Sequence, residues 1–329
     1  MLYLLFIPII FLLLAHTYRE YWARRNLPQL HFDSFEGKIL RVGETYIAHR
    51  AARSSRERTI ICFPGFLEDM RYFVDLYQDD EAELILINNA NYHCPFPTDQ
   101  ATSLHWTDNP YAVGSIEYDG FYLGLALERL ASGRDVLIHG HSRGGAVVLE
   151  AGRQRPDLMV SQHRTVSALL EAPVLPQART FGRGSEPIPH MIACYLMPIF
   201  FGHLRTISTE RLLKMPMMMP TTPLKTRLCR SVFSTARSYT TCVRNVQSIV
   251  RWQREAGFDL YDNFIEAKVL VGERDTTLDR ASMVASAEQG RERNSGVAII
   301  ETSGTNHFIC LERPEVVRGV AEQTAEIVK

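Results

Sequence analysis

The sequence predicts an α/β fold: a mostly parallel sheet covered by helices on both faces, with an inserted helical cap and an N-terminal membrane helix. Short, nearly continuous runs of Val, Ile and Leu alternate with segments whose apolar residues have helical spacing, which is typical of parallel strands buried on both faces. This alternation stops after residue 170 and resumes near residue 268. A chain of 329 residues also fits one such domain with an insertion better than two independent domains.

The predicted elements follow one another along the chain. The N-terminal helix ends before Pro28, because proline clashes with the preceding helical turn. A hairpin is then expected around Gly43 and Glu44. Strands are predicted at residues 38–42, 45–50, 59–63, 84–87, 135–139, 165–170, 268–271 and 297–302. Helices are predicted at residues 69–77, 116–130, 144–155 and 314–329.

The first fifteen residues carry no charged side chain. As a helix, 15 to 18 residues span ~22–27 Å, slightly less than a ~30 Å hydrocarbon core. Aromatic residues and arginines follow, as expected where a helix leaves the apolar layer: Tyr18, Arg19, Tyr21, Trp22, Arg24 and Arg25. We therefore expect an uncleaved membrane anchor over residues 1–27 and leave open which membrane face carries the rest of the chain. A cleaved signal peptide and a buried helix are the alternatives.

The region between residues 172 and 262 differs in composition from its surroundings. It holds half of the chain's 16 prolines and six of its 10 methionines, with a clear excess of Lys and Arg over Asp and Glu. Because this shift lies between two predicted strands, we interpret it as an inserted helical cap; further helical core is the alternative. The core would then comprise residues 28–171 and 263–329.

Composition excludes some classes of function. A formal net charge of −1 argues against a nucleic-acid partner bound through bulk charge. The six cysteines are scattered, without a CxxC pair or a Cys/His spacing typical of a metal site. We expect neither a metal nor a cofactor. A homodimer is possible.

Ser142 is the predicted nucleophile. It lies at the centre of the G-x-S-x-G pattern Gly140–Gly144, between a predicted strand and a predicted helix. Such a tight strand-to-helix turn needs residues without bulk beside the serine, and it exposes the hydroxyl above the sheet. The N–H groups at the start of the helix then point towards the reacting oxygen.

A nucleophilic serine needs a base, and the base needs an orienting acid. His307 follows the strand predicted at 297–302, which places it at the carboxyl edge of the sheet, where sites of open α/β folds assemble. Asp275 lies just past the preceding strand, so it is the predicted acid; Glu171 is the main alternative. His139 and His141 flank the serine along the chain, and we expect them to be packing residues.

Two N–H donors are needed to stabilise an oxyanion. One is expected from Arg143, the residue after the nucleophile. The other is expected from Phe66, which follows Pro64 and Gly65 after a predicted strand. An ordinary Pro-Gly turn is the alternative interpretation of this loop.

These segments resemble the α/β-hydrolase superfamily of lipases and esterases. The resemblance rests on the Pro64-Gly65-Phe66 loop, the 140–145 elbow, the 271–275 acid turn and the 306–315 terminus, in the family's order and spacing. It covers roughly residues 35–329 and is loose across the cap. It implies a reaction without cofactor or metal. Arg143 departs from the small or apolar residue often found there, and its guanidinium is expected to pair with a substrate phosphate or a cap acid.

The predicted reaction is acyl transfer from an ester to serine and then to water. An anchor would keep the site near lipid, and flexible methionines suit acyl chains. The cap's positive charge would attract anionic headgroups. We therefore expect a lipase or phospholipase A-like esterase; a thioesterase, an acyltransferase or a non-catalytic binding protein are the alternatives. The expected substrate-binding residues are Met215, Met217, Met218 and Met219.

Overall fold

A computed structural model describes residues 2–29, 32–54, 57–161, 164–179, 187–232 and 234–323. Among these residues, nine strands form one sheet in the order β5-β1-β2-β4-β3-β6-β7-β8-β9. The pairs β1–β2 and β2–β4 are antiparallel and the other neighbouring pairs are parallel, so the predicted mostly parallel sheet is confirmed. The strands are β1 (Lys38–Val42), β2 (Thr45–Arg50), β3 (Arg58–Phe63), β4 (Glu83–Ile87), β5 (Thr102–Leu104), β6 (Asp135–His141), β7 (Thr165–Glu171), β8 (Glu266–Gly272) and β9 (Val297–Thr302).

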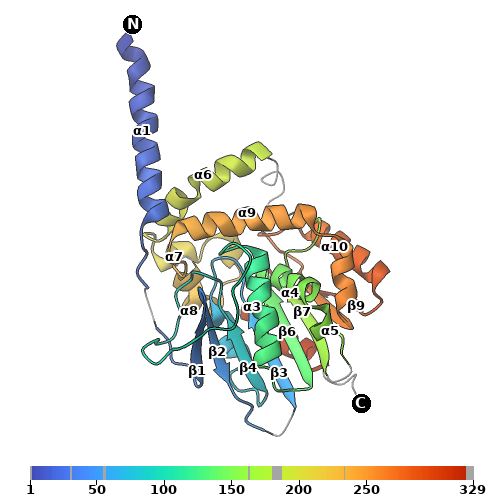
Figure 1. Cartoon of the computed structure of the whole chain (residues 1–329). Coiled ribbons are helices and arrows are strands. Elements are labelled where there is room, and N and C mark those ends of the chain that lie inside the picture. Colours follow the sequence, from blue (N-terminus) through green and yellow to red (C-terminus); the bar gives the residue numbers. More distant parts are fainter. Residues whose placement is uncertain are drawn as a thin grey trace.

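Helices cover both faces of this sheet (Figure 1). Along β6, Val136 and Ile138 join the apolar cluster that contains Val147, whereas Leu137 joins the opposite cluster, which contains Phe73. This alternation explains why β6 is apolar at consecutive positions from Val136 to Ile138. The helices outside the 172–262 region are α1 (Leu2–Arg24), η1 (Met70–Phe73), α2 (Val74–Tyr77), α3 (Ile116–Arg129), α4 (Arg143–Gln154), α5 (Pro156–Met159), α10 (Arg280–Arg293), α11 (Ile309–Glu312) and α12 (Pro314–Gln323). The rest of the predicted last helix, residues 324–329, lies outside the described residues.

The described part of residues 172–262 is helical and is inserted between β7 and β8. It lies over the carboxyl ends of the parallel strands, and α6 packs on α9 through its carboxyl-terminal half and rises away from it at the other end (Figure 1). Its helices are α6 (Pro187–Leu204), α7 (Thr209–Leu212), η3 (Pro216–Met218), α8 (Pro223–Val232), α9 (Tyr239–Glu255) and η4 (Phe258–Asn263).

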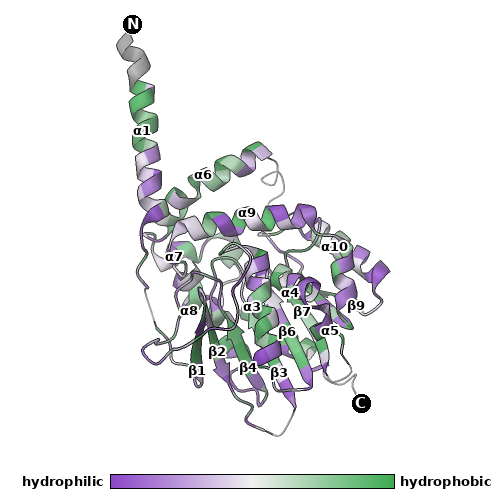
Figure 2. Ribbon diagram, viewed as in Figure 1, coloured by the Kyte–Doolittle hydropathy of each residue, from purple (hydrophilic) through white to green (hydrophobic). Residues whose placement is uncertain are grey.

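Helix α1 projects away from the rest of the chain, and its apolar part is exposed (Figures 1 and 2). Its carboxyl-terminal end packs on α6 and α9, and Ala23 is buried there. Within the described ranges, one helix is long and apolar enough to cross a membrane by length and composition alone, and this helix is α6 rather than α1. A membrane role for α1 therefore stays a prediction.

Candidate active site

Ser142 occupies a sharp turn between β6 and α4. Its φ of 52° and ψ of −116° are strained for a residue with a side chain. The turn has no room for bulk on either side: a Cβ on Gly144 would lie 2.1 Å from the carbonyl oxygen of Phe63, and one on Gly140 would lie 2.5 Å from the carbonyl oxygen of Gly144. The glycines of the G-x-S-x-G pattern are therefore required by close backbone approach.

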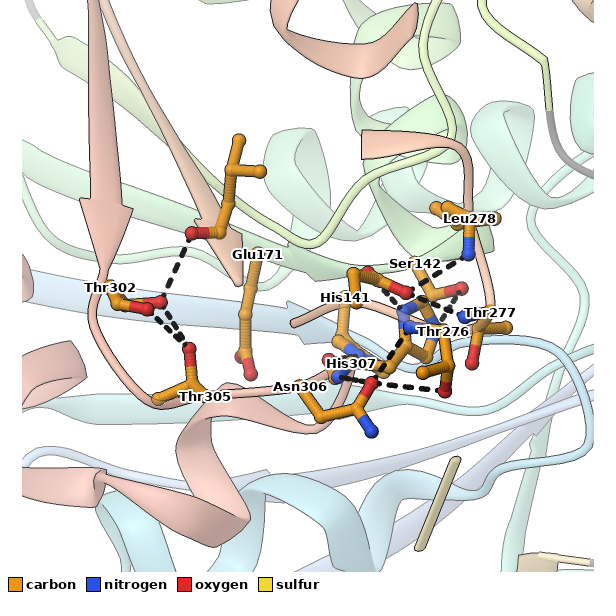
Figure 3. A network of polar contacts seen from close by, with 12 residues as sticks. His141, Ser142, Glu171, Thr276, Thr277, Leu278, Thr302, Thr305, Asn306 and His307 are labelled. Atoms are coloured by element: carbon orange, nitrogen blue, oxygen red, sulfur yellow. Dashed lines mark hydrogen bonds and ion pairs between the residues drawn. The ribbon is translucent and has the colours of Figure 1, made fainter. Parts of the chain in front are cut away.

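His307 lies between Ser142 and Asp275. Its Nε2 is 3.0 Å from the Ser142 Oγ (Figure 3). Its Nδ1 is 2.9 Å from the Asp275 Oδ2. Because a carboxylate only accepts hydrogen bonds, the Nδ1–H donates to Asp275 and leaves Nε2 to accept from the serine hydroxyl. The structure thus brings the three predicted triad residues into one hydrogen-bonded chain.

The Asp275 carboxylate is held ionised. Its Oδ1 accepts hydrogen bonds from the backbone N–H groups of Thr277 at 2.7 Å and Leu278 at 2.9 Å. Burial alone would raise the pKa of Asp275, but His307 and these donors outweigh burial and lower the pKa below its usual value. An ionised acid at this position orients the imidazole and can stabilise its protonated form.

Asn306 fixes the loop that carries His307. Its Oδ1 accepts from the N–H groups of His307 and Thr276, each at 2.9 Å, so the histidine loop and the acid loop share one acceptor (Figure 3). Its Nδ2 donates to the carbonyl oxygens of Pro216 and Met219. One buried amide therefore ties the predicted base and acid to the segment that contains η3.

Glu171, the alternative acid, is bound elsewhere. One of its oxygens accepts from the Tyr72 hydroxyl at 2.7 Å and from the Cys310 N–H at 2.6 Å, and the other is 3.0 Å from the His139 Nε2. In the described structure, the carboxylate that contacts the His307 ring is Asp275.

His141 is more than the packing residue we expected. It is buried, its Nδ1 is 2.7 Å from the Glu68 Oε2, and its Nε2 is 3.0 Å from the carbonyl oxygen of His307. The Tyr72 ring stacks on it at 4.3 Å. Burial alone would lower the pKa of His141, but the Glu68 carboxylate, together with Glu171 and the His307 carbonyl, more than offsets burial and raises the pKa to about 9. The Glu68–His141 pair is therefore joined to the backbone of His307 through the carbonyl oxygen of that residue.

This pair predicts a pH-dependent stability. The imidazole pKa is about 6.5 when unfolded and about 9 when folded. Its contribution is therefore complete below pH 6.5 and is lost as the pH rises through 9, by up to roughly 3 kcal/mol. Urea unfolding at several pH values across this range measures the change. The Glu68→Gln variant should show a weaker decline; an equal decline in both proteins would contradict this origin.

The loop that follows β3 lies directly beside the serine. The Gly65 N–H donates to Glu68 at 2.8 Å, and the Asn89 amide donates to the Gly65 carbonyl at 2.8 Å. A Cβ on Gly65 would be 2.9 Å from the Cβ of Ser142, so only glycine allows this approach. Phe66 follows at once and lines the cavity above the serine. Glu68 and Asn89, which hold this loop, were not identified from the sequence.

The Arg143 side chain differs from our expectation. It is fully buried and pairs with Asp119 at 2.7 Å, and it donates to Asn89 at 2.7 Å and to the Gly114 carbonyl at 3.2 Å. Among the described residues it contacts no acid of the 172–262 region, and it does not line the cavity above Ser142. The guanidinium instead fixes the start of α4 through these three contacts. Asp119 was missed because it lies in a segment with ordinary amphipathic spacing.

A cavity of about 170 Å³ opens above Ser142 and His307, and its lining is almost entirely apolar. Met215 and Met217, two of the expected substrate-binding residues, line it. Met218 is instead buried in the core and Met219 is half-exposed, and neither lines the cavity. The reason is the short η3 turn, which directs successive side chains in different directions.

Within the described residues, no group of three His, Cys, Asp or Glu side chains could hold a metal ion. All six cysteines are buried thiols. The structure brings a serine hydroxyl, an imidazole, a carboxylate and an apolar cavity together at Ser142.

Comparison with known protein families gives one match, which covers most of the chain. The model of the alpha/beta hydrolase family matches residues 46–320. The chain belongs to this family. The resemblance seen in the sequence is thus confirmed. No curated protein sequence is significantly similar to the chain.

Solved structures share the fold at low identity. MenH from S. aureus is 14% identical, with a TM-score of 0.58 over 84% of this chain and 97% of its own. An esterase from Exiguobacterium antarcticum is 13% identical, with a TM-score of 0.57 over 88% and 100%. A putative lipase from Acinetobacter baumannii AYE is 16% identical, with a TM-score of 0.58 over 94% and 93%. At these identities the likeness concerns the fold.

Proposed function

We propose that this member of the alpha/beta hydrolase family is a membrane-anchored serine hydrolase that cleaves carboxylic esters of lipid-like substrates. The observation that carries the proposal is the hydrogen-bonded chain from Ser142 through His307 to Asp275 at the base of an apolar cavity. Serine, histidine and aspartate in this geometry are the elements of acyl transfer.

The proposed reaction has two halves. The Ser142 Oγ attacks the ester carbonyl while the His307 Nε2 takes its proton; the same proton then passes to the leaving alkoxide as the ester C–O bond breaks. Water, deprotonated by His307, attacks the acyl-enzyme and releases the carboxylic acid and the serine hydroxyl. The backbone N–H groups of Phe66 and Arg143 are the proposed donors to both oxyanions. Arg143 opens α4, so its N–H has no partner within the helix.

The cavity supports an acyl chain as the part of the substrate it holds. Its lining above Ser142 is supplied by side chains such as Phe201, Leu204, Met215 and Met217. Burying a chain of CH₂ groups there is favourable by ~0.8 kcal/mol per group. By contrast, attraction of anionic headgroups has less support than the sequence suggested. Three cap cations already pair with acids: Lys214 with Glu210, Lys225 with Glu312 and Arg227 with Asp75.

A series of p-nitrophenyl esters tests this proposal. We expect kcat/KM to rise with acyl length until the cavity is filled, and a fluorophosphonate probe to label the serine. Met217→Ser should lower turnover of long esters more than of short ones. Met219→Ser is the matched control, because this side chain lies two residues away and outside the cavity. Fastest turnover of acetate, with equal effects of both variants, would argue for a general esterase.

Helix α1 is the proposed anchor. Its side chains from Ile7 to Leu14 are exposed, whereas Ala23 and Leu27 are buried against the domain. A chain that begins at His16 removes the apolar part and keeps this packing. We expect the full-length protein to stay in carbonate-washed membranes and the shortened one to be released, as sedimentation and immunoblotting would show. Release of both proteins would exclude an integral anchor.

A further inference from the structure

Helix α6 is apolar on two opposite faces. It contains no Asp, Glu, Lys or Arg. One face packs into the domain through residues such as Cys194, Phe201 and Leu204. The other face is a stripe of exposed residues spaced three or four apart: Ile188 (68% exposed), Met191 (64%), Ile192 (50%), Tyr195 (41%), Leu196 (48%) and Phe200 (53%). A helix that is hydrophobic all round is normally enclosed by protein or lipid, so this stripe lacks a cover within the described chain.

The buried face shows how α6 is oriented. Its buried residues all lie between Cys194 and Leu204, whereas residues 187–193 include none, and the helix packs on α9. The domain therefore holds the carboxyl-terminal half of α6, and the amino-terminal half projects from it (Figure 1). An uncharged helix whose apolar side chains face outward from the domain has a surface suited to contact with the apolar part of a membrane interface.

Helix α6 contacts the carboxyl-terminal part of α1. The Tyr195 hydroxyl is 2.9 Å from His16, and the Arg19 guanidinium lies over the Tyr195 ring at 5.3 Å. Trp22 lies against Gly202, where a Cβ would meet the indole at 2.4 Å. This is where the apolar part of α1 ends and its arginines and aromatic residues begin (Figure 2). Such residues occupy the membrane–water interface in anchored helices.

The end of α6 nearest α1 also reaches the cavity. Phe200, Phe201 and Leu204 line the space above Ser142. Phe200 is at the same time half-exposed and continues the outward stripe. Its ring therefore separates the cavity from whatever covers the outer face of α6.

We propose that the outer face of α6 lies in the lipid surface next to α1 and that an acyl chain passes from the bilayer past Phe200 to Ser142. This inference rests on the proposed function, since it names the route by which that site receives its substrate. The partner is lipid because the stripe is uncharged and continuous with the exposed apolar surface of α1. An acyl chain that takes this route never has to cross water.

Fluorescence of a single labelled cysteine tests the location of α6. The six native cysteines are buried, so an NBD group can be attached selectively to an exposed cysteine in the full-length protein. Met191→Cys places the label on the stripe. Ala52→Cys is the matched control. Ala52 is exposed in the loop between β2 and β3, at the amino ends of the parallel strands and so at the end of the sheet away from α6. Both proteins are reconstituted into phosphatidylcholine vesicles.

At position 191 we expect a blue-shifted emission that lipids with doxyl groups quench strongly and aqueous iodide quenches weakly. The label at position 52 should show the opposite. Iodide-accessible emission at both positions would overturn the proposal, and so would a blue shift without lipid quenching, which would indicate a protein partner or a second copy of the chain. Fluorophosphonate labelling of the same samples separates the two hypotheses: labelled serine with position 191 in water leaves the hydrolase intact and removes the lipid route.

Discussion

Replacing Ser142 with alanine should lower ester hydrolysis by roughly 10⁴- to 10⁶-fold, and His307→Ala should do the same. In the proposed mechanism the two side chains form one proton relay, and a hydrogen bond of 3.0 Å joins them. Because neither works without the other, the double variant should be little worse than either single one. Steady-state kinetics on a short soluble ester measures this without the complication of membrane binding.

Asp275→Asn should cost about 10⁴-fold, since an amide cannot hold the histidine in the tautomer that accepts the serine proton. Glu171→Gln is the informative comparison. Glu171 is also buried and bound to a histidine, but that histidine is His139. Thermal unfolding of both variants separates loss of chemistry from loss of fold. Full activity in Asp275→Asn together with none in folded Glu171→Gln would make Glu171 the acid.

The three proposed triad residues could be located from sequence because each one follows a strand signal directly. Ser142 ends the run of β6, Asp275 follows β8 and His307 follows β9. Since β6, β7, β8 and β9 are consecutive parallel neighbours, their carboxyl ends meet at one edge of the sheet. Local pattern and topology together are sufficient to bring these side chains within reach of one another.

The supporting residues gave no such signal. Glu68 meets His141 across 73 positions of sequence, and Asp119 meets Arg143 from a helix whose pattern resembles that of a surface element. Similarly, a run of adjacent methionines does not reveal which of them face a cavity, because a short 3₁₀ turn decides their directions. These features depend on the packing of distant segments, which spacing along the chain does not encode.

Among the contacts that hold the residues around Ser142, we expect the ion pair between Arg143 and Asp119 to contribute most to the free energy of unfolding. Both side chains are completely buried, and the shortest distance between them is 2.7 Å. Asp119→Ala leaves a guanidinium charge in the core, so we expect the free energy of unfolding to fall by roughly 3–5 kcal/mol. Chemical denaturation monitored by circular dichroism measures this loss.

Two comparisons distinguish a buried charge from a general packing defect. Replacing both partners, as in Asp119→Leu with Arg143→Met, removes the charge and should recover much of the stability lost by Asp119→Ala, because apolar residues can replace a buried pair. Asp157→Ala breaks the exposed pair with Arg155 at 3.0 Å and should cost less than about 1 kcal/mol. If Asp119→Ala cost no more than Asp157→Ala, the structure around Ser142 would not depend on this pair, and the position of the Arg143 N–H would rest on the backbone turn alone.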